Sequence, residues 1–235
     1  MTDRSARRDE LGHALRALDD RVDAACRDAG RRRDDVHVVV VTKYFPRSDV
    51  DLLLELGVRD LGENKAQEAQ AKLVDEGALP ADVRVHFVGQ LQSNKAALVA
   101  GFADVVHSVD RPKIVRALAK GAGEGHDLTA LIQVDLDGED PGRGGAAPGA
   151  VIELGDQVVE SGLRLGGVMA VAPRGADPAE AFARLQDLSA RLREAHPEAK
   201  IVSAGMSSDL EQAIAHGATH LRVGSAILGS RESHR

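Results

Sequence analysis

The 235-residue chain has one cysteine, no tryptophan and only 2% aromatic residues. The single cysteine, Cys26, excludes an intrachain disulfide, and no cluster of cysteine and histidine has the spacing of a zinc site. A net charge of −7 argues against nonspecific binding to nucleic acid or to a membrane surface. The first 20 residues are charged throughout, and no apolar run approaches the roughly 18 residues of a membrane span. We therefore expect a cytoplasmic protein with an aliphatic core.

What the chain does contain is a repeated alternation of short apolar runs and helical segments. Continuous apolar runs are typical of strands that are buried on both faces of a parallel sheet. The eight strand candidates are 36–43, 58–64, 83–89, 104–110, 128–137, 163–171, 199–206 and 220–229. The helix candidates between them are 49–56, 65–75, 94–100, 112–120, 150–160, 179–194 and 209–215. Apolar residues at helical spacing predict one more helix over 9–29, in front of the first strand.

Alternating strands and helices favour parallel βαβ units, either in a closed (β/α)8 barrel or in an open doubly wound sheet. Eight units and the absence of a G-x-G-x-x-G turn after the first strand favour the barrel. The expected fold is a single (β/α)8 TIM barrel with an extra N-terminal helix, forming one domain over residues 1–235. The stretch 137–149, rich in glycine and proline, reads as a loop after the fifth strand.

In such a barrel the functional groups stand where the strands end, and Lys43 follows the most apolar strand. Partial burial at the mouth of an aliphatic barrel lowers the pKa of a lysine and frees a neutral amine to form a Schiff base. The alternative is an ordinary lysine at a strand end, with its ammonium in solvent.

Small residues and hydroxyls follow the last two strands, where this fold commonly binds phosphate. They are Gly205, Met206, Ser207, Gly224 and Ser225. The alternative is that Ser207 or its neighbour Ser208 caps the following helix, which is compatible with phosphate binding.

Arg222, in the apolar run 220–229, needs an acceptor such as a carboxylate or a ring nitrogen if it faces the barrel interior. A lysine for a Schiff base facing a phosphate site suggests pyridoxal 5′-phosphate (PLP) as the cofactor.

A set of motifs also matches a known family, in order and over nearly the whole chain. The motifs are TKYFP (42–46), GENKAQE (62–68), HFVGQLQSNK (86–95), HSVDR (107–111), GVMAVAP (167–173), AGMSSDLEQAI (204–214) and RVGSAILGSR (222–231). The chain resembles the pyridoxal phosphate homeostasis protein family, which is related to the barrel of bacterial alanine racemases.

The resemblance implies a role for each matching residue. Lys43 matches the lysine that holds PLP as a Schiff base, and Arg222 matches the arginine directed at the pyridine nitrogen. Asn64 matches an asparagine that lines the pocket near the ring. The phosphate-holding segments match Gly205, Met206 and Ser207 after the seventh strand, and Gly224 and Ser225 after the eighth.

The resemblance implies a binding protein rather than an enzyme, one that keeps PLP available and delivers it to PLP-dependent apo-enzymes. The alternative is a PLP-dependent amino-acid racemase with weak or no activity. Racemisation needs two bases on opposite faces of the substrate. The only tyrosine, Tyr44, adjoins Lys43, so strand alternation points it away from the pocket.

A third alternative is a barrel enzyme that acts on a phosphorylated sugar without a cofactor, which leaves Arg222 unexplained. We expect no metal, no nucleic acid and no membrane as a partner. A monomer is the simplest oligomeric state. His86 and His107 lie in motif-bearing strands, where a packing role is at least as reasonable as a chemical one.

Overall fold

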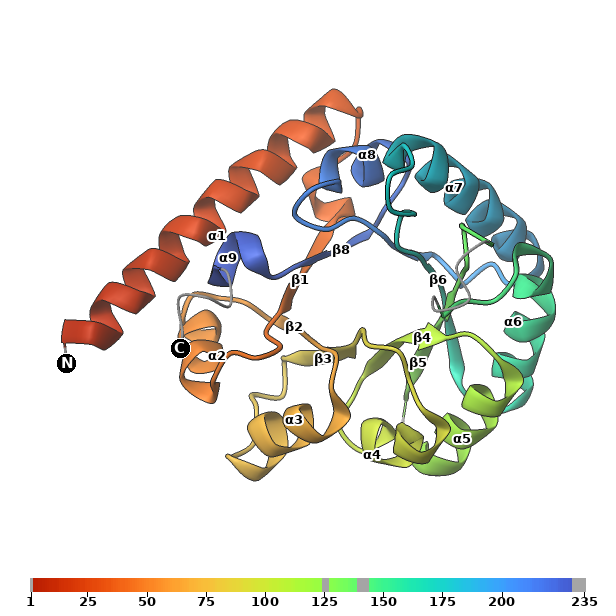
Figure 1. Cartoon of the computed structure of the whole chain (residues 1–235), viewed down its shortest axis with the longest axis horizontal. Coiled ribbons are helices and arrows are strands. Elements are labelled where there is room, and N and C mark those ends of the chain that lie inside the picture. Colours follow the sequence, from red (N-terminus) through yellow and green to blue (C-terminus); the bar gives the residue numbers. More distant parts are fainter. Residues whose placement is uncertain (1, 124–126, 139–143, 230–235) are drawn as a thin grey trace.

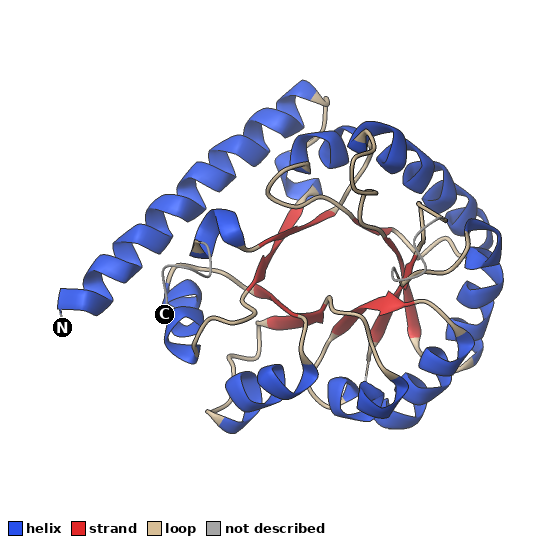
Figure 2. Cartoon of the chain, in the orientation of Figure 1, coloured by secondary structure: helices blue, strands red, loops and turns tan. Residues whose placement is uncertain are grey.

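The computed structural model describes residues 2–123, 127–138 and 144–229. Within these residues, eight parallel strands form a closed barrel in which each strand pairs with the next (Figures 1 and 2). The strands are β1 His37–Val41, β2 Asp60–Glu63, β3 Arg84–Phe87, β4 Val105–Val109, β5 Thr129–Gln133, β6 Arg164–Met169, β7 Ile201–Ser203 and β8 His220–Val223. β1 closes the barrel against β8, with His37 opposite His220 and Val40 opposite Val223.

Helices surround the barrel and connect successive strands (Figure 2). They are α1 Thr2–Asp28, α2 Arg47–Glu55, α3 Ala66–Gln70, α4 Ala96–Ala100, α5 Pro112–Ala122, α6 Val151–Glu160, α7 Pro178–Ala195, α8 Leu210–Ala215 and α9 Ser225–Leu228. Shorter turns are η1 Arg33–Asp35, η2 Ala71–Asp75, η3 Ser93–Lys95 and η4 Pro148–Ala150. The long helix α1 precedes the first strand and packs on the outside of the ring, against α2, α8 and α9 (Figure 1).

Buried side chains occupy two separate regions because successive residues of a strand point to opposite faces. The outer core lies between strands and helices and is aliphatic, with fully buried members such as Leu53, Ile114 and Leu185. The inner core fills the barrel. Its apolar part is Val105, Leu131 and Met169, with Ile201 packed against them. Its polar part is His86, His107, Ser203 and Arg222, all buried.

The expected barrel and its extra N-terminal helix are confirmed. Two local expectations differ from the structure, and a third falls partly outside the described residues. The run 220–229 is strand only to Val223 and then forms the short helix α9. The helix expected over 65–75 is α3 followed by the π-helical turn η2. The expected loop 137–149 includes 139–143, which lie outside the described residues.

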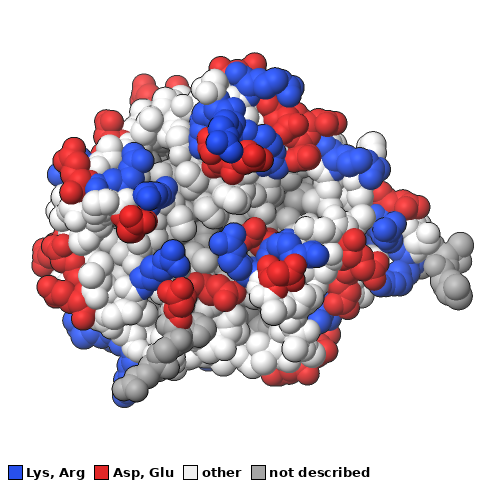
Figure 3. Space-filling model, turned by 180° about the vertical axis from the view of Figure 1, so that it is seen from behind, with Lys and Arg blue, Asp and Glu red and all other residues white. Residues whose placement is uncertain are grey.

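Among the described residues, no helix combines the length and apolar character needed to cross a membrane. On the face shown in Figure 3, basic and acidic side chains lie side by side.

Candidate functional site

A cavity of about 620 Å³ opens where the carboxyl ends of the strands meet. Of the eight candidate residues, seven line it: Lys43, Asn64, Met206, Ser207, Arg222, Gly224 and Ser225. They come from the ends of β1, β2, β7 and β8, which are distant in the sequence. Gly205 is not among the lining residues, but directly precedes Met206. Barrel closure thus brings the candidate lysine, arginine and serines around one cavity.

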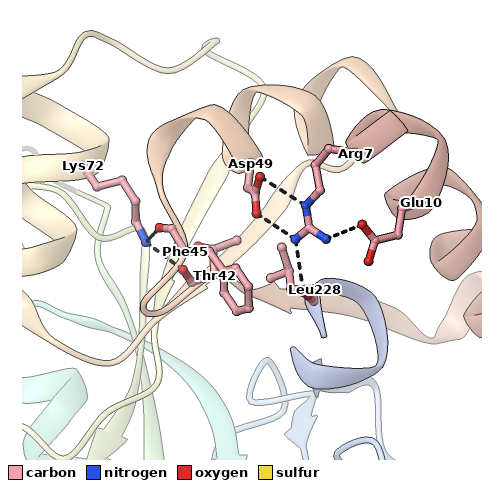
Figure 4. Close-up of polar contacts among 7 residues, drawn as sticks. All are labelled: Arg7, Glu10, Thr42, Phe45, Asp49, Lys72 and Leu228. Atoms are coloured by element: carbon pink, nitrogen blue, oxygen red, sulfur yellow. Dashed lines mark hydrogen bonds and ion pairs between the residues drawn. The ribbon is translucent and has the colours of Figure 1, made fainter. Parts of the chain in front are cut away.

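Hydrogen bonds hold the backbone on both sides of Lys43, a half-buried residue in the turn after β1. The backbone N–H of Thr42 donates to Gly62 O on β2 over 2.9 Å. Lys72 Nζ donates to the carbonyl oxygens of Thr42 and Phe45 over 2.7 and 3.0 Å (Figure 4). These bonds hold the backbone of residues 42–45 and so fix the place from which Lys43 enters the cavity.

Lys72 is itself held by a buried ion pair. Its Nζ lies 2.6 Å from Glu63 Oε1, and Thr42 Oγ1 donates to the same oxygen over 2.6 Å. Burial raises the pKa of the Glu63 carboxyl, and the Lys72 ammonium opposes that rise. Glu63 belongs to the GEN motif. This residue of the motif therefore acts through Lys72, which it holds against the backbone of the turn that carries Lys43.

Tyr44 does not point away from the cavity, and that prediction is wrong. β1 ends at Val41, and Tyr44 has a φ of 68°, a left-handed conformation that breaks the two-residue period of a strand. Tyr44 is among the residues that line the cavity, and its ring centroid lies 5.9 Å from Lys43 Nζ and 4.4 Å from Lys65 Nζ. The backbone N–H of Tyr44 donates to Glu68 Oε1 over 2.5 Å, which stabilises this turn.

Asn64 presents a polar atom that has no protein partner. Among the described residues, its Oδ1 is buried and accepts no hydrogen bond. Its backbone lies so close to Gly89 that a Cβ on this glycine would come within 2.1 Å of Asn64 O. The glycine of the HFVG motif therefore permits the position of Asn64, which links two motifs that are separate in the sequence.

The two loops after β7 and β8 meet at the same side of the cavity. Gly205 has a φ of 89°, which favours glycine, and the chain then turns so that Met206 N donates to Asp209 Oδ1 over 2.6 Å. Ser207 Oγ and Ser225 Oγ lie 3.3 Å apart. Asp209 occupies the cap position of α8, with no side-chain capping bond, so neither Ser207 nor Ser208 is its cap.

Two arginines of α1, outside the barrel, donate hydrogen bonds to the backbone of these two segments. The sequence analysis did not predict either arginine. Arg21 Nη1 donates to Ser207 O over 2.7 Å, and its guanidinium pairs with Glu211. Arg7 pairs with Asp49 and donates to Leu228 O over 3.1 Å (Figure 4).

A signal for these arginines exists in the sequence. Arg7 lies four residues before Leu11, and Arg21 lies three residues after Leu18. Both therefore continue the apolar stripe that faces the barrel.

Arg222 is almost fully buried on β8 and donates two hydrogen bonds within the protein. Nη1 bonds to Ser203 Oγ over 2.6 Å and Nη2 to Ala170 O over 2.9 Å. Burial lowers the pKa of this guanidinium to about 10, with Asp209 acting in the opposite direction. The group is therefore cationic at neutral pH and lines the cavity, as the sequence predicts for an arginine that faces the barrel interior.

This arrangement provides an amine, a cation, a hydroxyl pair and an unpaired amide oxygen around one cavity. In the described part of the chain, no group of three or more histidine, cysteine, aspartate or glutamate side chains is placed to hold a metal ion. The set fits a small anionic molecule with a ring and a carbonyl group, since an amine attacks carbonyls and hydroxyls bind phosphate.

Comparison with known proteins supports this interpretation of the cavity. The family model of the alanine racemase N-terminal domain matches residues 15–232. The pyridoxal phosphate homeostasis protein of Mycobacterium tuberculosis H37Rv is 43% identical over 244 positions, covering 96% of this chain and 94% of that protein. The protein of the same description from Escherichia coli K12 is 33% identical over 229 positions, covering 95% and 97%.

A solved structure resembles the barrel over most of its length. PipY of Synechococcus elongatus PCC7942, solved with PLP bound, aligns with a TM-score of 0.77 at 31% identity. The alignment covers 93% of this chain and 100% of that one.

Proposed function

Because this chain belongs to the alanine racemase N-terminal domain family and, within it, to the pyridoxal phosphate homeostasis proteins, we propose that it holds PLP as a Schiff base on Lys43. In this proposal it keeps the cofactor available and passes it to PLP-dependent apo-enzymes in the cytoplasm. It acts as one domain over residues 1–235 and as a monomer.

The observation that carries the proposal is the convergence of Lys43, Arg222 and the Ser207–Ser225 hydroxyl pair on one cavity. PLP supplies an aldehyde for covalent attachment and a phosphate for anchoring. Lys43 provides the amine, while Ser207, Ser225 and the backbone at Gly205, Met206 and Gly224 surround the phosphate. Asn64, which lines the cavity from the end of β2, lies beside the ring.

Arg222 determines what the bound ring can do. A guanidinium has donors only, so Arg222 donates to the pyridine nitrogen and keeps that nitrogen unprotonated. An unprotonated nitrogen withdraws fewer electrons, which makes the ring a weaker electron sink. Arg222 therefore favours holding the cofactor over using it to stabilise a substrate carbanion.

The cavity also supports carriage over racemisation. Racemisation needs one base on each face of the substrate. Lys43 and Tyr44 are consecutive residues of one turn, so both reach the cavity from the β1 side. Of the described residues that line the cavity, those from the β7 and β8 side are Met206, Ser207, Ser208, Arg222, Gly224, Ser225 and Gly229, and none of them is a histidine, a lysine, a tyrosine or a carboxylate. The alternative is a slow racemase that uses Tyr44 as its second group.

The test of carriage is transfer of PLP to an apo-enzyme in the presence of a phosphatase that destroys free PLP. We expect the PLP-loaded protein to restore apo-enzyme activity while an equal amount of free PLP fails. The variant Lys43→Ala is expected to give no protection, whereas the exposed neighbour Lys65→Ala behaves as wild type. Equal restoration by free PLP and by the loaded protein would contradict carriage.

Racemisation is measured on the same sample by chiral chromatography of L-alanine. We expect no D-alanine above the level formed by free PLP. Formation that depends on both Lys43 and Tyr44, tested with Tyr44→Phe, would establish the racemase instead.

A further inference from the structure

A chain of buried hydrogen bonds crosses the inside of the barrel from Asp60 on β2 to Arg222 on β8. Asp60 Oδ1 lies 2.9 Å from His86 Nε2, and His86 Nδ1 lies 2.9 Å from His107 Nε2. His107 Nδ1 in turn lies 2.9 Å from Ser203 Oγ, which accepts a 2.6 Å hydrogen bond from Arg222 Nη1. His86, His107 and Ser203 are fully buried, so each relies on its neighbours in the chain for hydrogen bonding.

The chemistry of the two ends sets the direction of every bond. The Asp60 carboxylate can only accept, so with both rings neutral His86 must carry its proton on Nε2 and accept at Nδ1. His107 Nε2 must then donate to His86, which leaves His107 Nδ1 as an acceptor for the Ser203 hydroxyl. Ser203 Oγ still accepts from Arg222, which can only donate. All donors therefore point from Arg222 toward Asp60, and both histidines are Nε2–H tautomers.

The electrostatics of the interior agree with a neutral His107 ring. Burial lowers the pKa of His107 well below its ordinary value, and the nearby Arg222 cation lowers it further. At the other end, burial raises the pKa of the Asp60 carboxyl, but the hydrogen bond from His86 and the charge of Arg84 bring it below its ordinary value. A carboxylate at Asp60 and a neutral ring at His107 thus lie along one hydrogen-bond chain with a cationic Arg222.

Two sets of other titratable groups face this hydrogen-bond chain. Asp209, in the loop after β7, acts on Arg222 at the carboxyl end of the barrel, and the others lie at the amino ends of the strands. Arg84 Nη2 on β3 is 3.1 Å from Asp60 Oδ1. The His220 ring on β8 is 6.1 Å from that of His86 and 4.9 Å from that of His37 on β1. Burial lowers the pKa of His220 to about 3, so this ring is neutral as well.

We propose that Asp60, His86, His107 and Ser203 are positioning residues for Arg222, acting as one polarised hydrogen-bond chain. The chain directs electron density at Ser203 Oγ toward the guanidinium, because each donated proton makes the donor atom a stronger acceptor. With Nη1 on Ser203 and Nη2 on Ala170 O, the orientation of the guanidinium plane is set. One further step, donation of a remaining Arg222 N–H to the ring nitrogen of PLP, rests on the proposed function. The hydrogen-bond chain itself does not depend on it.

His86 and His107 do not line the cavity, and the hydrogen-bond chain gives both of them a role behind it. If they were only packing residues, their tautomers would carry no relation to Ser203. If they are links in one chain, a change at Ser203 reaches His86 through His107.

The first test is the long-range 15N–1H NMR spectrum of the histidine rings, recorded at neutral pH without cofactor. We expect His86 and His107 each to show a protonated Nε2 and an unprotonated Nδ1. A proton on Nδ1 of either ring, or a doubly protonated His86, would reverse the order of donors and overturn the proposal. Because wild-type protein is used, no variant needs to fold.

The second test compares two buried serines. Ser203→Ala removes the donor to His107, so we expect the Nδ1 resonance of His107 to move toward that of an imine nitrogen without a hydrogen bond and His86 to shift with it. Ser189→Ala on α7 is the control, since among the described residues the Ser189 hydroxyl has no partner. Unchanged His86 and His107 resonances in Ser203→Ala would contradict coupling along the chain.

The third test asks whether the hydrogen-bond chain affects bound PLP. In PLP-loaded Ser203→Ala, the pH midpoint of the visible absorption change is expected to shift from that of wild type, with no shift in Ser189→Ala. An unshifted midpoint would refute the influence on Arg222. If the wild-type protein and Ser189→Ala both fail to bind PLP while the wild-type tautomers are as expected, the proposed function fails and the hydrogen-bond chain stands.

Discussion

The outer core and the inner core are built from the two faces of the same strands, yet they hold together by different means. In the outer core, side chains such as Leu53, Ile114 and Leu185 fill space between strands and helices and need only the right volume. In the inner core, His107 and Ser203 are equally buried, but each depends on a named donor or acceptor. Barrel closure is stabilised mainly by the first region, and the orientation of the site depends on the second.

The comparison also predicts how the two regions respond to mutation. A side chain removed from the outer core leaves a cavity whose cost follows its size. A side chain removed from the inner core leaves a partner with an unsatisfied hydrogen bond, and the cost follows the polarity of that partner. The Glu63–Lys72 pair is a polar feature on the helix side of the barrel, where it is expected to behave like the inner core.

The largest loss is expected for Lys72→Met, which leaves the Glu63 carboxylate buried without its cation. Breaking such a pair costs about 3–5 kcal/mol of unfolding free energy. Urea unfolding measures the loss. The double variant Glu63→Gln with Lys72→Met is expected to recover much of it, because no charge then stays buried. A double variant less stable than Lys72→Met would contradict this account.

A similar loss, about 2–5 kcal/mol, is expected for Leu185→Ala in the outer core. Leu185 is fully buried on α7. Its matched control is Val159→Ala on α6, where half of the side chain is exposed, and the change there is expected to stay within about 0.5 kcal/mol. Equal losses from the two variants would show that the outer core is not packed as described.

Acid is expected to weaken the inner core before the outer one. His107 and His220 have folded-state pKa values below those of the unfolded chain, so the unfolded chain binds more protons as the pH falls. The stability they contribute is present above the unfolded value of about 6.5 and is lost toward the folded value, about 3 for His220. Each costs about 1.4 kcal/mol per pH unit below about 6.5.

Urea unfolding measured between pH 7 and pH 5 checks this dependence. His220→Gln is expected to reduce the slope of stability against pH, whereas His13→Gln on the exposed face of α1 leaves it unchanged. A slope that is the same in all three proteins would mean that His220 takes up a proton in the folded state.

The smallest expected change compares one serine from each region. Ser203→Ala in the inner core leaves Arg222 and His107 each short of one bond and is expected to cost about 1–3 kcal/mol. Ser189→Ala in the outer core removes a hydroxyl that has no partner among the described residues, and is expected to be neutral or stabilising. Thermal unfolding of the two variants measures the difference directly, and an equal cost would remove the distinction between the regions.

The outer core was largely predictable from sequence. Apolar runs that alternate with helical segments indicate strands covered on both faces, and the barrel follows from their number. The sequence predicts one strand over 220–229 because Ala226, Ile227 and Leu228 are as apolar as the strand before them, and the four residues of α9 are too few to show a helical period. The π-helical turn η2 after α3 is likewise too short to show a period of its own in the sequence.

The inner core and the site were predictable only in part. Small residues and hydroxyls after β7 and β8 predict that these two loops contribute to one site, and both loops do line the cavity. An isolated arginine in an apolar strand predicts that Arg222 faces the barrel interior, where it is buried. The partner of His107 is Ser203, 96 residues away, so only barrel closure brings the two together. Tyr44 was misplaced because one left-handed residue ends the alternation on which the prediction relied.

The central claim, that Lys43 is the attachment point of PLP, is tested most directly by borohydride reduction of the loaded protein followed by peptide mass mapping. The account predicts one reduced pyridoxyl phosphate group per chain, on Lys43, and none on its neighbours Lys65 and Lys72. Lys65→Ala should label like wild type, whereas Lys43→Ala should not label. A group fixed mainly on Lys65, or spread over several lysines, would contradict the account.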